Sequence, residues 1–131
     1  METASKVTTR YTDNGDGTIT DSKTNLVWMK EDDGKERNWN DAKKYCEDND
    51  AKLPGKEWRM PTREELLTII DLERYRPAAD PIFNAKSDWY WSSTPFAFGS
   101  GSAWCVGFSS GYVGWGNLVD VGLVRPVRQN S

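Results

Sequence analysis

The chain has 131 residues, a formal net charge of −3, seven tryptophans, two cysteines and no histidine. This length suits a single domain, and the acidic balance with interspersed basic residues argues against nucleic-acid binding, which needs a basic stripe. Without histidine, the chain cannot use a Ser-His or Cys-His nucleophile or a histidine-ligated metal, although carboxylate, lysine, tyrosine or cysteine chemistry stays open.

The sequence YTDNGDGTITDSKTNLVWMK near the start resembles a calcium loop in its glycines and acidic residues. In an EF-hand alignment with Gly17 at the sixth position, however, Thr12 and Lys23 occupy the first and twelfth positions, where carboxylates are needed. A tight turn is the better interpretation, because NGDG tolerates positive φ and the following TIT is typical of a strand. We expect a β-hairpin without a metal, a second turn over 21–25 and a strand over 26–30.

Two helices are expected in the middle of the chain. Alanine, tyrosine and cysteine recur at helical spacing over residues 40–49, after asparagines that can cap a helix. Thr62 and Glu65 form an S/T-x-x-E capping box, and the apolar residues after them predict a second helix that ends near Leu72. The following sequence, RYRPAADPIF, contains two prolines and is expected to be a loop.

In the last third of the chain, short strand-forming sequences alternate with glycine- and serine-rich turns. The sequence FSSGYV predicts a hairpin between strands at 103–108 and 112–115. The order of a hairpin, two helices and then several strands indicates an α+β domain. We expect its first and last strands to pair and to bring the termini together.

Aromatic residues are concentrated between residues 89 and 115. Six rings in periodic or motif positions are expected to pack in the core: Trp28, Trp39, Trp58, Trp91, Trp104 and Phe108. Exposed rings can stack on the apolar face of a ligand while neighbouring polar groups fix its orientation by hydrogen bonds. The predicted ligand-binding residues are five aromatics beside glycine- and serine-rich turns, where the rings cannot all be buried, and two polar neighbours: Trp89, Phe96, Phe98, Tyr112, Trp115, Asn117 and Asp120.

Cys46 and Cys105 allow two interpretations. In a secreted domain they could form a disulfide bond, which would close a loop of about sixty residues and stabilise the fold by about 4 kcal/mol. Alternatively, both are small buried hydrophobic side chains. The choice stays open because a bridge needs Cα atoms within about 7 Å. Two cysteines without histidine are too few for a structural zinc site, and no cofactor is expected.

Seven motifs occur in the order found in the Lcl C-terminal domain family, which the chain resembles over residues 10–128: YTDNGDGTITDSKTNLVWMK, WNDAKKYC, WRMPTREEL, DPIF, YWSST, AWCVGFSSG and VRPVR. This family takes its name from the terminal domain of a bacterial collagen-like adhesin. The resemblance implies a C-type-lectin-like fold, with two helices, short antiparallel strands and long loops that carry the ligand surface. It also implies a secreted or cell-surface location, often at the tip of a fibre, and similarity to trimer-forming tips.

The chain departs from these relatives in three respects. The type member binds sulfated polysaccharides, which favour a basic surface, whereas this chain is net acidic. Many lectin-like domains join a helix cysteine, matched here by Cys46, to a cysteine of the last strand, where this chain carries Pro126. The Glu-Pro-Asn and Trp-Asn-Asp triplets of the lectin calcium site are absent, and WGNLVD resembles the second triplet only weakly. Calcium-dependent sugar binding is therefore not expected.

The expected organisation is a tail or strand lead-in at 1–9 followed by one domain at 10–131. No apolar run approaches the roughly 20 residues of a membrane span, so membrane insertion is not expected. Residues 1–20 lack the hydrophobic core of a secretion signal, so the chain is expected to be cytoplasmic or a mature fragment without its targeting segment.

Together, these features favour a non-catalytic extracellular recognition module, an adhesin or fibre-tip domain that binds a glycan or a surface protein. Weak single sites would gain strength from multivalent display on a homotrimer. Two alternatives remain: a structural oligomerisation cap without a ligand, and a hydrolase with two carboxylates among Asp80, Asp88 and Asp120. Arg125 and Arg128 are expected to pair with acidic residues at the base of the fold rather than to bind an anion.

Overall fold

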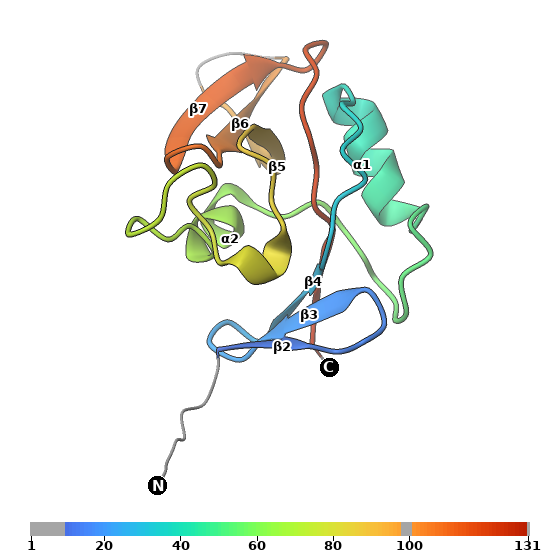
Figure 1. Ribbon diagram of the computed structural model, residues 1–131. Helices are drawn as coiled ribbons and strands as arrows, with labels where there is room; N and C mark the ends of the chain where they lie inside the picture. Colours follow the sequence, from blue (N-terminus) through green and yellow to red (C-terminus); the bar gives the residue numbers. More distant parts are fainter. Residues whose placement is uncertain (1–9, 98–100, 131) are drawn as a thin grey trace, which may run out of the picture.

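The computed structural model of the chain describes residues 10–97 and 101–130, so the predicted lead-in at 1–9 and the candidate Phe98 lie outside the described residues. Within these residues, two antiparallel sheets and two α-helices confirm the predicted α+β class. A four-stranded lower sheet lies at the base of the molecule, close to both ends of the described chain, and a three-stranded upper sheet lies at the opposite end (Figure 1).

The lower sheet contains the two turns predicted from the glycine-rich start of the chain. Asp13 and Asp16 stabilise the first turn, because their carboxylates accept hydrogen bonds from the N–H groups of Gly15 and Thr18 at 2.9 and 3.1 Å. The hairpin prediction is confirmed, and no three His, Cys, Asp or Glu side chains gather as metal ligands among the described residues. In spatial order the strands are β2 (Tyr11–Asp13), β3 (Thr18–Asp21), β4 (Leu26–Met29) and β8 (Val127–Gln129).

The pairing of the last strand differs from the prediction. β8 pairs with β4, where Trp28 lies opposite Val127, and not with the first described strand, β2, which stays at the edge of the sheet. The chain end is nevertheless held at the base, because the N–H of Asn130 donates to the carbonyl of Asn25 at 3.0 Å.

The two helices begin where the sequence predicts them. Helix α1 (Trp39–Glu47) is capped by Asn38, and helix α2 (Arg63–Thr68) has both hydrogen bonds of the Thr62–Glu65 capping box. Helix α2 ends four residues before the predicted end at Leu72. Beyond it, Ile70 forms an isolated β-bridge with Ala79. The segment predicted as a loop contains a short 3-10 helix, η1 (Pro81–Phe83).

The upper sheet confirms the predicted FSSGYV hairpin. Its strands, in order, are β5 (Trp89–Pro95), β6 (Ser102–Gly107) and β7 (Tyr112–Asn117). The outer edge of β5 is covered by the segment at Leu123, which donates to the Trp89 carbonyl at 2.9 Å and accepts from the Trp91 N–H at 2.8 Å.

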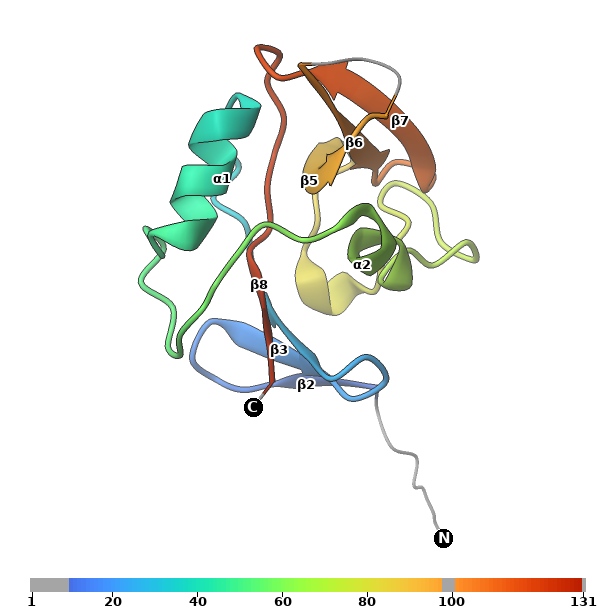
Figure 2. The same ribbon diagram turned by 180° about the vertical axis from the view of Figure 1, so that it is seen from behind.

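The core consists of two clusters on the two faces of the upper sheet. One face contributes Tyr90, Val106 and Phe108 to a central cluster that also contains Trp28 of the lower sheet and Leu66 of α2. The other face packs in part against α1, and Figure 2 shows α1 and α2 on opposite sides of β8. Of the six rings predicted to pack, Trp28, Trp58, Trp91 and Phe108 are buried, while Trp39 and Trp104 are half-buried.

Both cysteines are free thiols buried in the α1 cluster, so the disulfide alternative does not hold in this structure and the alternative of two small buried side chains does. Burial raises the pKa of the Cys105 thiol to about 11 and raises the pKa of the Cys46 thiol further.

A buried ion pair connects the lower sheet to the upper sheet. Arg125 is fully buried and donates to Asp32 at 2.9 Å and to the carbonyls of Met29 and Phe83 at 2.9 and 3.1 Å. The Tyr90 hydroxyl donates to the same Asp32 carboxylate at 2.5 Å. The predicted pairing of Arg125 with an acid is therefore confirmed.

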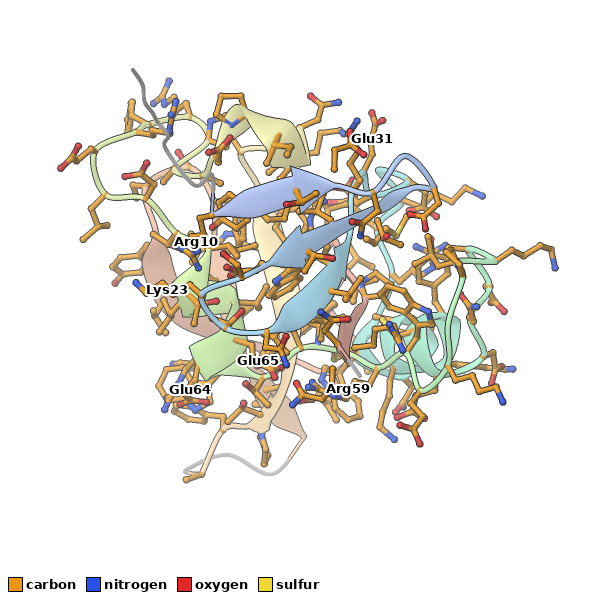
Figure 3. The ribbon with its side chains drawn as sticks, turned by 90° about the horizontal axis from the view of Figure 1, so that it is seen from below. Arg10, Lys23, Glu31, Arg59, Glu64 and Glu65 are labelled. Carbon is orange, nitrogen blue, oxygen red and sulfur yellow. The ribbon has the colours of Figure 1, made fainter. Side chains whose placement is uncertain are left out.

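Other charged side chains surround the lower sheet. Arg128, predicted to pair with an acid, instead donates to the Lys56 carbonyl at 3.0 Å, without an acidic partner among the described residues. Arg59 donates to both carboxylate oxygens of Glu65 at 2.7 and 2.8 Å, and Arg10 forms a bidentate pair with Asp21 at 2.8 and 2.7 Å. Figure 3, seen from below, places Arg10, Arg59 and Glu65 around this sheet.

Candidate functional site

An open groove of about 470 Å³ lies on the outer face of the upper sheet, beyond the part that α1 covers. This volume falls within the range of roughly 300–1,000 Å³ typical of ligand sites. The residues that line it come from β5, β6, β7 and the loop after β7: Trp89, Trp91, Cys105, Tyr112, Val113, Gly114, Trp115, Gly116, Asp120, Val121 and Gly122.

The strand register explains how the rings reach this face. Trp89 of β5 lies opposite Gly107 of β6, which in turn lies opposite Tyr112 of β7, so the three form one row across the sheet. A Cβ atom on Gly107 would lie 3.3 Å from the Trp89 ring, and one on Gly114 would lie 3.0 Å from it. Both glycines therefore provide the space in which the Trp89 ring crosses the neighbouring strands.

Trp89 and Tyr112 form an exposed aromatic pair. Their ring centroids are 6.1 Å apart with an interplanar angle of 72°, an edge-to-face arrangement. Trp89 is 39% exposed and Tyr112 is 69% exposed, so both keep much of their surface open to a ligand. Trp91 is buried beside them, and its indole N–H donates to the Arg37 carbonyl at 2.9 Å.

A second hollow of about 300 Å³ adjoins the groove. Trp89 and Tyr112 line both hollows, so the aromatic pair forms their common wall. Asp120 lines the groove, and Asp88 lines the second hollow. The lining of the second hollow is otherwise small and polar: Ser87, Gly107, Ser109 and Ser110.

Comparison with protein families decides what kind of domain carries this groove. The model of the family described as the Lcl C-terminal domain matches residues 17–128. The chain belongs to the Lcl C-terminal domain family. This membership suggests a domain of a surface or secreted protein. A search of curated proteins finds no match. In the described part of this Lcl C-terminal domain, no helix is long and apolar enough to cross a membrane.

The six predicted ligand-binding residues that the structure describes do not form one surface. Trp89, Tyr112 and Asp120 line the groove as described above. Trp115 also borders it, but Trp115 lies opposite Trp104 in the register, on the other face of the sheet from Tyr112, and its ring stacks on Phe96 at 4.8 Å. Phe96 packs edge-on against Trp104 at 5.0 Å, and Arg63 lies over Trp104 at 4.7 Å. These rings form a separate aromatic stack.

Asn117 lies at the end of β7, outside the groove lining. Its side-chain oxygen accepts a hydrogen bond from the Ser102 hydroxyl at 3.3 Å, and its backbone N–H donates to Asp120 at 3.2 Å. Asn117 therefore holds the loop that carries Asp120 in this Lcl C-terminal domain, rather than lining the groove itself.

Several groove residues were not predicted as site residues: the glycines at 114, 116 and 122, the exposed Val121 and the buried Trp91. A signal for the first two was present in the sequence GWG, because glycine inside a strand often marks the close approach of another group. No sequence signal indicated Val121 or Gly122, because they follow the strand in a loop whose path is set by its contacts with β5.

Proposed function

We propose that this Lcl C-terminal domain is a non-catalytic recognition module of a secreted or surface-displayed protein, and that its groove binds a carbohydrate. The observation that carries the proposal is the exposed Trp89–Tyr112 pair beside Asp120 in an open hollow. Sugar rings have apolar C–H faces and polar rims, and aromatic walls with a few polar groups match that pattern. The C-type-lectin-like arrangement is part of the proposal, with the lower sheet near the chain ends and the ligand surface on the upper sheet.

Support for a non-catalytic role comes from the placement of the carboxylates considered for a hydrolase. Glycoside hydrolysis requires two carboxyl groups that flank one scissile bond. Among the described residues, each hollow is lined by one acidic residue, Asp120 or Asp88, and the Trp89–Tyr112 pair stands between the two. Asp80 instead caps η1, where its carboxylate accepts the Ile82 N–H at 3.0 Å.

A glycan array with the purified domain and two variants tests the proposal. Tyr112→Ala removes a groove wall, and Tyr75→Ala is the matched control, because Tyr75 is similarly exposed at 65% but lies in the loop after α2. We expect glycan binding by the wild type and the control and its loss in Tyr112→Ala, with all three proteins folded. Equal binding by all three proteins, or binding of a protein ligand alone, would contradict the proposal.

An oligomerisation cap is the second candidate, favoured by exposed apolar side chains beside the edge strand β7. Val119, Val121 and Trp115 are 83%, 58% and 55% exposed. Such side chains cover one another in an assembly, and the predicted homotrimer would bury them. Sedimentation of the wild type and of Val119→Asp, combined with the glycan array, separates the candidates, because a cap requires an oligomer that this variant dissociates and no glycan binding by that oligomer.

A further inference from the structure

The two hollows beside the aromatic pair have an acidic character. Asp120 lines one and Asp88 the other, and no lysine or arginine lines either hollow among the described residues. Both side chains are exposed, and neither forms an ion pair within the described part of the chain. Each accepts a single backbone hydrogen bond, Asp88 from Trp89 at 2.8 Å and Asp120 from Asn117 at 3.2 Å. A carboxylate has about four acceptor positions, so each keeps capacity for a ligand.

Two of the cations near the hollows, Arg37 and Lys86, have acidic partners elsewhere. The Arg37 guanidinium donates to Asp33 at 2.7 Å and lies over the Tyr45 ring at 3.9 Å. Lys86 lies 3.6 Å from Asp32, in the network around Arg125. These two side chains therefore do not compensate the charge of Asp88 and Asp120. The side chain of Arg76, whose backbone N–H donates to the Ser109 carbonyl at 2.9 Å, lies over the Tyr75 ring at 5.0 Å.

The shared wall makes the two hollows parts of one elongated site. Trp89 and Tyr112 stand between them, with one acidic residue lining each side. A chain ligand can therefore stack on the aromatic pair and place a group beside each carboxylate. Anionic groups would meet like charges at both ends, whereas cationic groups would meet opposite charges.

On the basis of the function proposed above, we infer that the elongated site selects oligosaccharides of unacetylated amino sugars. In such a sugar, a rigid ring presents an apolar face for Trp89 and Tyr112, and a protonated amine is bonded directly to a carbon of that ring. The ammonium group is a hydrogen-bond donor with a positive charge, which suits both Asp88 and Asp120. A flexible lysine side chain of a peptide offers the charge without the flat rigid face, so the combination of wall and carboxylates favours the sugar.

Calorimetry with three oligomers of equal length tests this inference: a β-1,4-linked glucosamine pentamer, its fully N-acetylated counterpart and a sulfated glucosamine oligomer. Exposed ion pairs contribute modestly, so two of them give a preference for the free amine of about tenfold. We expect the glucosamine pentamer to bind most tightly and the sulfated oligomer most weakly. The preference should shrink as salt rises from low ionic strength to about 1 M.

The double variant Asp88→Asn/Asp120→Asn should bind the two unsulfated pentamers equally. Asp50→Asn/Glu57→Gln is the matched control, because it makes the same change in net charge at exposed positions outside both hollows, and it should keep the preference. Equal binding of both pentamers by the wild type, with Tyr112→Ala still abolishing it, would overturn the charge inference but leave the carbohydrate-binding proposal intact. Tightest binding of the sulfated oligomer would overturn the inference as well. Absence of binding to all three probes, together with a blank glycan array, would overturn both.

Discussion

Trp89 and Tyr112 come from strands that are not neighbours, yet their rings meet at a centroid distance of 6.1 Å across Gly107 of the strand between them. A larger residue at that central position would separate the pair. The shape of the candidate site therefore depends on glycines as much as on the aromatic side chains. Gly107 and Gly114 give the Trp89 ring its place on the sheet.

The two glycines of the GWG sequence are expected to respond differently to alanine. In Gly114→Ala the new Cβ would lie 3.0 Å from the Trp89 ring, whereas in Gly116→Ala the nearest atom, on Trp91, is 3.4 Å away. Overpacking of this kind costs about 1–3 kcal/mol, so Gly114→Ala should lower the free energy of unfolding more than Gly116→Ala. Denaturant unfolding of both variants gives the comparison. If Gly116→Ala lowers the free energy of unfolding more than Gly114→Ala, the proposed packing of the Trp89 ring against Gly114 is wrong.

Asp32→Ala is expected to destabilise the fold strongly, because it leaves the guanidinium of Arg125 buried without its counter-charge. Breaking a buried pair in this way costs about 3–5 kcal/mol. The control is Asp33→Ala, whose carboxylate pairs with Arg37 but is 30% exposed, and exposed pairs contribute about 1 kcal/mol or less. The measurement is the free energy of unfolding in urea.

If Asp32→Ala does not fold, Tyr90→Phe tests the same network more gently. It removes only the hydroxyl that donates to Asp32 at 2.5 Å, and a loss of about 1–3 kcal/mol is expected. A Tyr90→Phe variant as stable as the wild type would show that the network around Asp32 contributes little.

Stability should fall in acid because of carboxylates at the base. Burial alone would raise the pKa of Glu65, but hydrogen bonds from Arg59 and the Thr62 N–H outweigh it and hold that pKa below its ordinary value. The same balance, with Arg10 as the main donor, lowers the pKa of Asp21. The folded state therefore binds fewer protons than the unfolded state, whose carboxyl groups titrate near pH 4.

The stability from these pairs is fully present above about pH 5 and is lost as the pH falls through the folded-state pKa values. Urea unfolding between pH 6 and pH 2 should show this decline, and Glu65→Gln should show a shallower one. An unfolding free energy that stays constant or rises over this interval would contradict the account.

The two thiols should be inert in the folded protein. Both are free and buried, and burial raises the pKa of Cys105 to about 11, so little reactive thiolate is present at neutral pH. A thiol reagent should react slowly with the native domain, whereas it should react with two thiols per chain in the unfolded domain. Recovery of no thiol after unfolding without reductant would mean that Cys46 and Cys105 are bonded.

Features that depend on residues close together in the sequence were predictable, whereas many features that depend on contacts between distant segments were not. The Thr62–Glu65 capping box indicated the start of α2, because its two partners are only three residues apart in the sequence. The end of the same helix depends on Ile70, which pairs with Ala79 nine positions later, and propensity does not reveal that bridge.

The candidate site shows the same division. Exposure of Trp89, Tyr112 and Trp115 followed from the neighbouring glycine and serine turns. Strand parity alone could have separated Tyr112 from Trp115, since residues three apart in a strand point to opposite faces. The stacking of Trp115 on Phe96, however, depends on packing between separate segments.

The most direct test of the central claim is an NMR titration of the ¹⁵N-labelled domain with its tightest glycan from the array. Each tryptophan indole N–H gives its own signal, so the seven tryptophans report on both faces of the upper sheet and on the core. The account predicts that the signals of Trp89 and of the β7 backbone from Tyr112 to Gly116 shift with ligand, while those of Trp28 and Trp58 stay unchanged. Shifts confined to the lower sheet, or to the indole of Trp104 with Trp89 unaffected, would contradict it.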